Sequence, residues 1–427
     1  MEAKQQDVAI KGDRIAAIGD LSGDTAGKVI DASGLTVTPG FIDVHSHAAP
    51  GLKKKSLSAA HSILANGVTT VMISPDGQGP LDLKEERAEL EAVGVGVNVA
   101  QLIGHGSIRK KFFGTKNIQP TARQLEEMKA YVQQAMEDGA YGMSSGPFYA
   151  AGFYSTTEEL IELSKVAAAY GGLYTSHIRD ESSYTIGVEK AVEEVITISR
   201  EAGITGIITH IKCLGPEVWD KAPSIVEKIN QARAEGLEVY ADQYPYEASS
   251  TGFNAALFPR DPLEGEALRE AVRRNLQRRG GPQKIGMNKF AGRRLSEVIK
   301  EMGKDPITAI IEINKKGGGS IVSYNMSPEN KSLFMKQPWT MTCSDGGLHS
   351  LVGDDPVHPR NFGAFARKIR KYVVEDKIID LPTAIRSMTG LAAEVCHIED
   401  RGFIRPGAYA DLLVFDPLKV KDKATFD

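Results

Sequence analysis

The stretch from Gly40 to His47, GFIDVHSH, is a short apolar run that ends in two histidines. In an extended strand, residues two apart point to the same face, so His45 and His47 would lie about 7 Å apart, with both rings able to reach one metal ion. A His-x-His pair alone is weak evidence, because two polar residues at a strand end explain it equally well. Its meaning depends on the rest of the chain.

Seven further short apolar runs alternate with helical segments. They are Val68 to Ser74, Val97 to Gly104, Ala140 to Ser145, Leu173 to Arg179, Gly206 to Ile211, Leu237 to Tyr244 and Trp339 to Asp345. Amphipathic stretches such as Thr157 to Tyr170 and Gly187 to Ala202 fill the gaps. Alternating strands and helices are typical of a parallel sheet, and eight strands close a barrel. We therefore predict an α/β fold, a (β/α)8 TIM-type barrel.

The two chain ends have a different pattern. Asp7 to Gly19 alternates apolar and polar residues around a Gly-Asp turn, and Gly402 to Pro417 has a Pro-Gly turn before a β-rich run. We expect residues 1–39 plus 402–427 to form a small β-sandwich satellite domain, and residues 40–401 to form the catalytic barrel.

One gap between strands is too long for a simple connection. Roughly ninety residues separate the seventh run from the eighth, whereas a βα connection normally takes a few tens at most. We predict an insertion at about 252–338 between strands 7 and 8, mainly helical and placed over the barrel mouth.

Composition and charge exclude several classes of protein. The 427 residues are 41% hydrophobic, and 51 Lys and Arg against 55 Asp and Glu give a net charge of −4, which is unlike the basic footprint of nucleic-acid binding. No apolar segment is long enough to span a membrane, and Met1 to Asp20 lacks a signal-peptide pattern. Three cysteines suit a reducing compartment. We expect a cytoplasmic enzyme with a small-molecule substrate, no nucleic-acid or membrane partner, and a possible homo-oligomeric assembly.

Chemistry-bearing residues stand at the ends of several predicted strands. His177 ends the fifth run, His210 ends the sixth, and Asp345 ends the eighth. Barrel enzymes gather their catalytic groups at the carboxyl ends of the strands. These residues and the pair at His45 and His47 would therefore converge on one mouth, which indicates a metal site.

The sequence resembles the amidohydrolase superfamily from about Asp7 to Asp416, and within it the N-acyl-D-amino-acid deacylases, or D-aminoacylases. The motifs that carry the resemblance are TPGFIDVHSH (Thr38 to His47), GVTTV (Gly67 to Val71), YGMSSG (Tyr141 to Gly146), SHIRDE (Ser176 to Glu181), THIKCLG (Thr209 to Gly215), DQYPYEASST (Asp242 to Thr251), CSDGG (Cys343 to Gly347) and HPRNFGAF (His358 to Phe365). They occur in the family's order and at similar spacing.

The resemblance implies a metal centre with one or two zinc ions, or another divalent metal. It assigns His45, His47 and Asp345 to a more exposed metal position, and His177 and His210 to a buried one. Where the family carries a bridging cysteine after the second strand, this chain reads ISPDG, which places Asp76 at that position. A carboxylate is a harder ligand than a thiolate, so metal identity and metal count stay open, as does a plain turn-forming role for Asp76.

These parts suffice for amide hydrolysis. A zinc ion lowers the pKa of bound water from near 15.7 to about 7 and polarises the amide carbonyl. Asp345 would act as the general base and then return the proton to the leaving amine.

A free amino-acid product carries an α-carboxylate that needs positively charged and polar partners. The resemblance assigns its binding to Lys212, Arg360, Tyr244 and Ser250, although Tyr246 and Ser249 are equally plausible in the same run.

The leading hypothesis is hydrolysis of N-acyl-D-amino acids to a carboxylate and a free D-amino acid. The alternatives are a cyclic-amide hydrolase of the dihydroorotase or hydantoinase kind, or a dipeptidase, on the same scaffold. The family's hydantoinases and dihydroorotases carry a carboxylated lysine after the fourth strand, and this chain has none there. A non-catalytic relative that uses the barrel for protein interaction is a further alternative, against which the intact set of histidines argues.

Overall fold

A closed barrel of parallel strands forms the centre of the molecule. The computed structural model describes residues 4–350 and 357–426, and all eight predicted runs form strands in it. In chain order the strands are β4 (Phe41–Asp43), β6 (Val68–Ile73), β7 (Asn98–Gln101) continued by β8 (Ile103–Gly104), β9 (Gly142–Ser145), β10 (Leu173–Ser176), β11 (Thr205–Ile208), β12 (Val239–Gln243) and β16 (Thr340–Thr342). Hydrogen-bonded pairing runs from β4 to β7 and from β8 to β16, always parallel. The predicted barrel is confirmed.

The first and last strands are joined at the mouth of the barrel. Just beyond them, β5 (Ser46–His47) pairs in parallel with β17 (Gly346–Gly347). Beneath this pair, the Asp43 carboxylate accepts a hydrogen bond of 2.9 Å from the backbone amide of Ser344, 301 residues away along the chain. The seam between β4 and β16 is therefore closed beside the predicted site.

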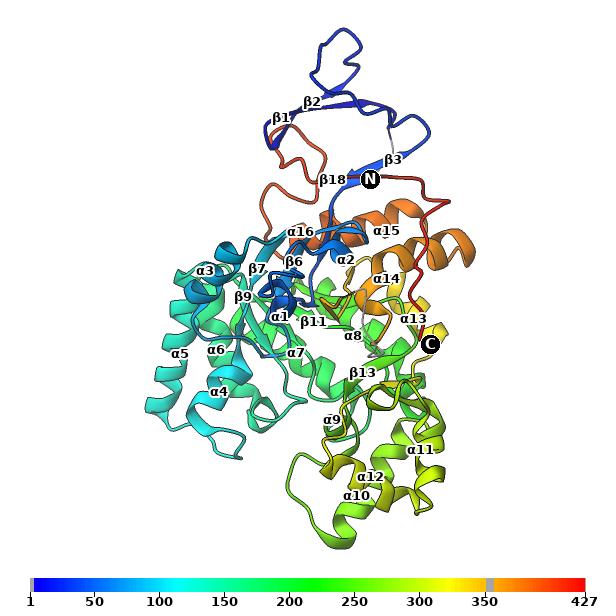
Figure 1. Cartoon of the computed structure of the whole chain (residues 1–427). Coiled ribbons are helices and arrows are strands. Elements are labelled where there is room, and N and C mark those ends of the chain that lie inside the picture. The colour runs from blue at the N-terminus through cyan, green and yellow to red at the C-terminus, as the bar shows by residue number, and fades with distance from the viewer. Residues whose placement is uncertain (1–3, 351–356, 427) are drawn as a thin grey trace.

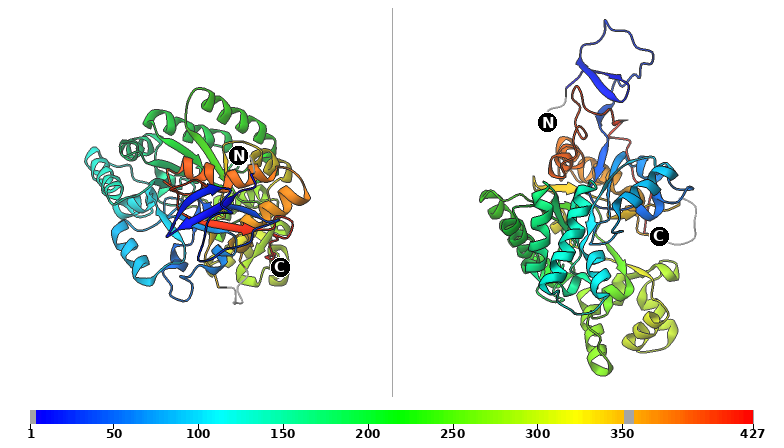
Figure 2. Two further views of the ribbon diagram at one scale, coloured as in Figure 1. Left: turned by 90° about the horizontal axis from the view of Figure 1, so that it is seen from above. Right: turned by 90° about the vertical axis from the view of Figure 1, so that its left-hand side faces the viewer.

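Helices surround the strands, as the view from above shows (Figure 2). They are α1 (Ala49–Leu52), α2 (His61–Leu64), α3 (Leu83–Val93), α4 (His105–Phe113), α5 (Ala122–Glu137), α6 (Thr157–Ala169), α7 (Val188–Ala202), α8 (Ala222–Ala234), α13 (Pro328–Met335), α14 (Arg360–Arg367), α15 (Leu381–Met388) and α16 (Gly390–Val395). In α7 the buried residues Val188, Val192, Val195 and Ser199 recur at intervals of three and four, which turns one apolar stripe toward the strands. No helix within residues 4–350 and 357–426 is long and apolar enough to cross a membrane.

The long segment between β12 and β16 packs around a core of its own. It contains β13 (Ser249–Gly252), α9 (Phe253–Leu257), α10 (Gly265–Arg278), β14 (Ile285–Met287), α11 (Leu295–Met302), α12 (Pro306–Lys315) and β15 (Ser320–Ser323). Besides the expected helices, it has an antiparallel sheet in the order β13-β15-β14. Figure 1 shows its helices at the end of the molecule opposite β1 and β2.

The two chain ends meet in a small β domain (Figure 1). In it β1 (Asp7–Lys11) and β2 (Arg14–Gly19) form a hairpin, and β3 (Thr36–Pro39) pairs with β18 (Leu412–Phe415) in an antiparallel ribbon. Phe415 of this ribbon packs edge-on against Phe41 of the barrel, at 6.4 Å between ring centroids. The β domain therefore adjoins the foot of the first barrel strand and lies away from the mouth.

Candidate metal centre and active site

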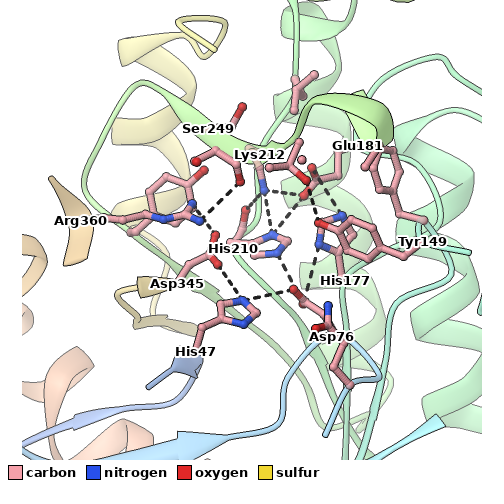
Figure 3. Close-up of a pocket in the computed structure, with 18 of the residues that line it drawn as sticks. His47, Asp76, Tyr149, His177, Glu181, His210, Lys212, Ser249, Asp345 and Arg360 are labelled. Carbon is pink, nitrogen blue, oxygen red and sulfur yellow. Dashed lines mark hydrogen bonds and ion pairs between the residues drawn. The ribbon is translucent and has the colours of Figure 1, made fainter. Parts of the chain in front are cut away.

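The six predicted metal ligands come from loops that leave the carboxyl ends of five barrel strands. These are His45 and His47 after β4, Asp76 after β6, His177 after β10, His210 after β11 and Asp345 after β16. All are buried except His47, which is partly exposed. Figure 3 shows the labelled members of this set turned toward one common space. The structure thus brings together residues that lie up to three hundred positions apart.

Three of these residues adopt a backbone conformation that is rare for residues other than glycine. Asp76 has φ 58°, His210 has φ 37° and Asp345 has φ 50°, all in the left-handed region. Such strain costs free energy, of the order of 1–3 kcal/mol at each residue, and is found mainly where function requires it. Here it turns three short loops sharply, so that their side chains point into the mouth.

Asp76 lies at the centre of the cluster. Its Oδ1 is 3.4 Å from His45 Nε2, 3.7 Å from His177 Nδ1 and 3.9 Å from His210 Nε2. Its other oxygen, Oδ2, is 3.4 Å from His47 Nε2. One carboxylate thus faces both histidine pairs, which is the placement that a ligand shared by two metal ions requires.

Asp345 closes the other side of the cluster. Its Oδ1 is 3.3 Å from His47 Nε2 and 3.6 Å from His45 Nε2. Three sets of ligand atoms lie within 4.8 Å of one another: His45, His47 and Asp76; His45, His210 and Asp345; Asp76, His177 and His210. Asp345 therefore groups with a histidine from each predicted metal position.

The donor set fits a divalent metal. Both ring nitrogens of His45 and of His177, and Oδ1 of Asp76, are buried and have no hydrogen-bond partner among the described residues. Buried polar atoms without partners cost free energy, and a bound cation would satisfy them together. Nitrogen and oxygen donors of this kind suit zinc and similar ions.

The electrostatics of the cluster agree with this fit. Burial lowers the pKa of His45 to about 3 and that of His177 to about 4, so both rings are neutral, as metal ligation requires. At His47 burial acts in the same direction, but hydrogen bonds to Asp345 and Asp76 outweigh it and raise the pKa to about 10. The two carboxylates thus strongly favour a positive charge at this point.

The second nitrogen of His210 is held by an acidic residue. His210 Nδ1 lies 3.0 Å from Glu181 Oε1, and Glu181 Oε2 lies 3.8 Å from His177 Nε2. The same Nδ1 lies 2.7 Å from Lys212 Nζ. In the tautomer whose Nδ1–H donates a hydrogen bond to Glu181, His210 Nε2 is free for a metal, the usual arrangement behind a ligating histidine. Glu181 stands in SHIRDE, four residues after His177, but sequence reasoning did not assign it to the site.

The predicted substrate-binding residues line a cavity of about 400 Å³ above the cluster. Two of them are cations that pair with acids of the site. Arg360 Nη1 lies 2.6 Å from Asp345 Oδ2, and Lys212 Nζ forms an ion pair with Glu181. Both cations are therefore at the cavity wall, next to the position where substrate would bind.

The tyrosine and serine candidates are separated by the structure. Tyr244 lines the cavity, whereas the Tyr246 hydroxyl turns away and donates to the Pro359 carbonyl at 3.3 Å. Ser249 and Ser250 both line the cavity, and the Ser249 hydroxyl donates to Asn325 Oδ1 at 3.2 Å.

One aromatic residue of the cavity wall was missed at the sequence level. The ring of Tyr149 lies 4.6 Å from that of His177, centroid to centroid. Burial raises the pKa of the Tyr149 hydroxyl, so this group stays protonated at neutral pH and can donate a hydrogen bond. It stands after YGMSSG in the sequence, and only the fold of that loop reveals its place.

Comparisons with known proteins agree with this geometry. A sequence profile of the amidohydrolase family matches residues 28–242 and 332–427. The unmatched stretch between them covers most of the segment between β12 and β16, which has a hydrophobic core of its own. The matched stretches carry nearly all of the barrel and the six predicted metal ligands, whereas Tyr244 and Ser250 lie between them.

Two curated relatives match nearly the whole chain. An N-acyl-D-glutamate deacylase of Alcaligenes xylosoxydans xylosoxydans is 34% identical over 99% of this chain and 86% of its own length. A D-aminoacylase of the same organism is 32% identical over 99% of this chain and 87% of its own.

A solved structure is similar over the same range. The N-acyl-D-glutamate deacylase of Bordetella bronchiseptica, crystallised with zinc and a phosphonate mimic of the tetrahedral intermediate, has a TM-score of 0.86 and 32% identity, covering 99% of this chain and 88% of its own. The chain belongs to the amidohydrolase family and, within it, to the N-acyl-D-amino-acid deacylases, or D-aminoacylases.

Proposed function

We propose that this protein is a zinc-dependent deacylase that hydrolyses the amide bond of N-acyl-D-amino acids, giving a carboxylate and a free D-amino acid. The observation that carries the proposal is the cluster of unpartnered histidine and aspartate atoms at the floor of a cavity lined by Lys212 and Arg360. In this proposal residues 40–401 are the catalytic domain, residues 252–338 are an insertion that covers its mouth, and residues 1–39 plus 402–427 carry no site residue.

The metal would be held by the four histidines together with Asp76 and Asp345. Asp76 lies between the pairs and would be the shared ligand if two ions bind. When bound, such an ion lowers the pKa of water and polarises an amide carbonyl. Burial of the histidines keeps water from competing for their nitrogens.

Asp345 is placed to move the proton. Its Oδ2 lies 2.6 Å from Arg360, while Oδ1 faces the histidines, where the attacking water would lie. Burial alone would raise its pKa, but the charge of Arg360 and the histidines lowers the pKa well below its usual value. It is therefore ionised before the reaction, takes a proton from the water, and delivers it to the nitrogen of the leaving amine as the C–N bond breaks.

The α-carboxylate of the substrate would bind at the cavity wall next to Asp345. Arg360 and Lys212 supply positive charge there, and Tyr244 and Ser250 supply hydroxyl groups. A guanidinium fork suits a carboxylate, and binding it beside Asp345 would place the scissile amide over the cluster.

The experiment that tests the proposal measures amine release from paired N-acetyl-D- and N-acetyl-L-amino acids, with metal analysis of the same sample. We expect turnover of D-substrates only, with one or two zinc ions per chain, and loss of turnover after chelation that zinc restores. Activity confined to cyclic amides or to L-dipeptides would overturn the proposal in favour of the alternatives named above.

Removing a buried histidine should cost both metal and stability. We expect His177→Ala and His210→Ala to bind less zinc and to unfold at a lower temperature than the parent, because metal binding is linked to folding. The exposed His61→Ala is the matched control and should change neither quantity. Metal content after dialysis and a thermal melt measure both effects, and full zinc content in both buried variants would remove them from the site.

A further inference from the structure

Arg279 is a buried arginine on the cavity wall that the deacylase mechanism does not use. It follows the last residue of α10, in the segment between β12 and β16, and it lines the same cavity as Asp345 and the histidines. Only 1% of its surface is exposed. An arginine cannot lose its proton under ordinary conditions, so this position carries a permanent positive charge.

No carboxylate of the described residues lies within ion-pair distance of this charge. The Arg279 Nε donates to the Ala256 carbonyl at 3.2 Å, and Nη1 donates to the Ser323 hydroxyl at 3.0 Å. Both acceptors are neutral, and within residues 4–350 and 357–426 no acceptor bonds to Nη2. A buried charge normally has a partner of opposite charge, because its desolvation is costly.

The other cations of the cavity differ from Arg279 in this respect. Lys212 pairs with Glu181, and Arg360 pairs with Asp345. A neighbouring arginine, Arg260, adds to the positive charge on this side. Its Nε and Nη1 donate to the carbonyls of Phe148 and Phe258, which are neutral and leave its charge unpaired.

Asp180, an acid on the same side of the cavity as Arg260, does not supply the missing charge. Asp180 acts on Arg260 only at a distance, and its oxygens accept from the backbone amides of Ser182 at 2.8 Å and Gly187 at 3.0 Å. The wall therefore holds positive charge that no described side chain neutralises.

We propose that Arg279 binds a second carboxylate of the substrate, so that the preferred substrates are dianionic N-acyl-D-amino acids. The second carboxylate belongs either to an acidic side chain or to a dicarboxylic acyl group, and the same guanidinium chemistry recognises both. The inference rests on the proposed deacylase function and names its substrate class. It makes Arg279 a specificity-determining residue, because monoanionic substrates of equal size, which carry only the α-carboxylate, would leave its charge unpaired.

The test compares substrates that differ in charge but hardly in size. For the side-chain source these are N-acetyl-D-glutamate and N-acetyl-D-glutamine, and for the acyl source N-succinyl-D-alanine and N-butyryl-D-alanine. We expect kcat/KM to favour the dianionic member of at least one pair by about 100-fold, the scale of a lost hydrogen bond to a charged group. The pair that shows the preference identifies the source.

Variants of Arg279 decide whether this residue is responsible. Arg279→Met should remove the preference by lowering kcat/KM for the dianionic substrate alone, and Arg279→Lys, which keeps the charge, should retain part of it. Arg274→Met is the matched control, since Arg274 is exposed on the same helix and should leave the preference intact. If Arg279→Met fails to fold, the ratio measured for Arg279→Lys, with its melting temperature, still tests the inference.

Two results would overturn this inference alone. One is equal turnover of the dianionic and monoanionic members of both pairs. The other is an equal loss for both members in the Arg279 variants, which would show a structural role or a role in binding the α-carboxylate common to all substrates. Failure to hydrolyse any N-acyl-D-amino acid, monoanionic or dianionic, would instead overturn the deacylase function and this inference with it.

Discussion

Asp345→Asn is expected to keep its metal and to lose turnover by about a thousandfold, the scale of a missing general base. An amide can still occupy the place of the carboxylate, but it cannot accept a proton from the attacking water. Asparagine also tolerates the left-handed backbone at this position, φ 50°, better than most residues, so the fold should be retained. The measurements are kcat on an N-acetyl-D-amino acid, metal content and a thermal melt.

The chain offers a matched control for this substitution. Asp400 also has a left-handed backbone, φ 55°, and also pairs with an arginine, Arg14, at 2.9 Å, but it lies in the small β domain region away from the site. Asp400→Asn should leave kcat unchanged. Turnover of Asp345→Asn above a tenth of the parent value would show that another group is the base.

Asp76→Ala is expected to reduce bound metal and activity together, because its carboxylate faces all four histidines. Asp76→Cys supplies a thiolate at the same position and should keep metal, with a stronger preference for zinc over manganese, since thiolates favour softer ions. Asp76→Asn is the control for the turn, because it keeps the left-handed backbone and removes the charge. Metal content after dialysis against mixed zinc and manganese measures all three variants.

A purely structural role for Asp76 predicts a different result. In that case metal content would be unchanged in Asp76→Ala, and the loss of stability would be about 1 kcal/mol, the scale of one local hydrogen bond. The contacts favour the ligand role, since the turn is closed by the Gln78 amide and the Pro75 carbonyl at 3.0 Å and not by the Asp76 side chain.

Sequence patterning predicted the barrel well because its strands are buried on both faces. Runs such as Val68–Ile73, VTTVMI, are apolar and β-branched along their length, and helical segments separate them clearly. The strands of the inserted segment escaped prediction for the opposite reason. Ser249–Gly252, SSTG, has no apolar alternation, and it becomes a strand only because β15 lies beside it.

The same distinction applies to the site. Ligand candidates could be found because strand ends meet at one mouth, whatever path the loops take. Ion pairs between loops could not be found from the sequence. Arg360 pairs with Asp345 only because of the path that the chain takes between these two residues. Arg279 was hidden in the same way: its sequence context, RRNLQRR, resembles an exposed basic face of a helix, and only packing shows that one of these arginines points inward.

The closed seam between β4 and β16 also has a consequence for the order of events during synthesis on the ribosome. His45, His47 and Asp76 emerge early, but Asp43 must wait for Ser344, 301 residues later, before the barrel can close. Closing a loop of that length costs about 5 kcal/mol of free energy in lost chain entropy, because the cost rises with the logarithm of the loop length. From residue 210 onward the nascent chain therefore carries five of the six predicted metal ligands, but it lacks Asp345 until the inserted segment has been made. Ion capture and barrel closure become late and mutually dependent steps, so zinc supplied at the end of synthesis should speed the final folding of the whole chain.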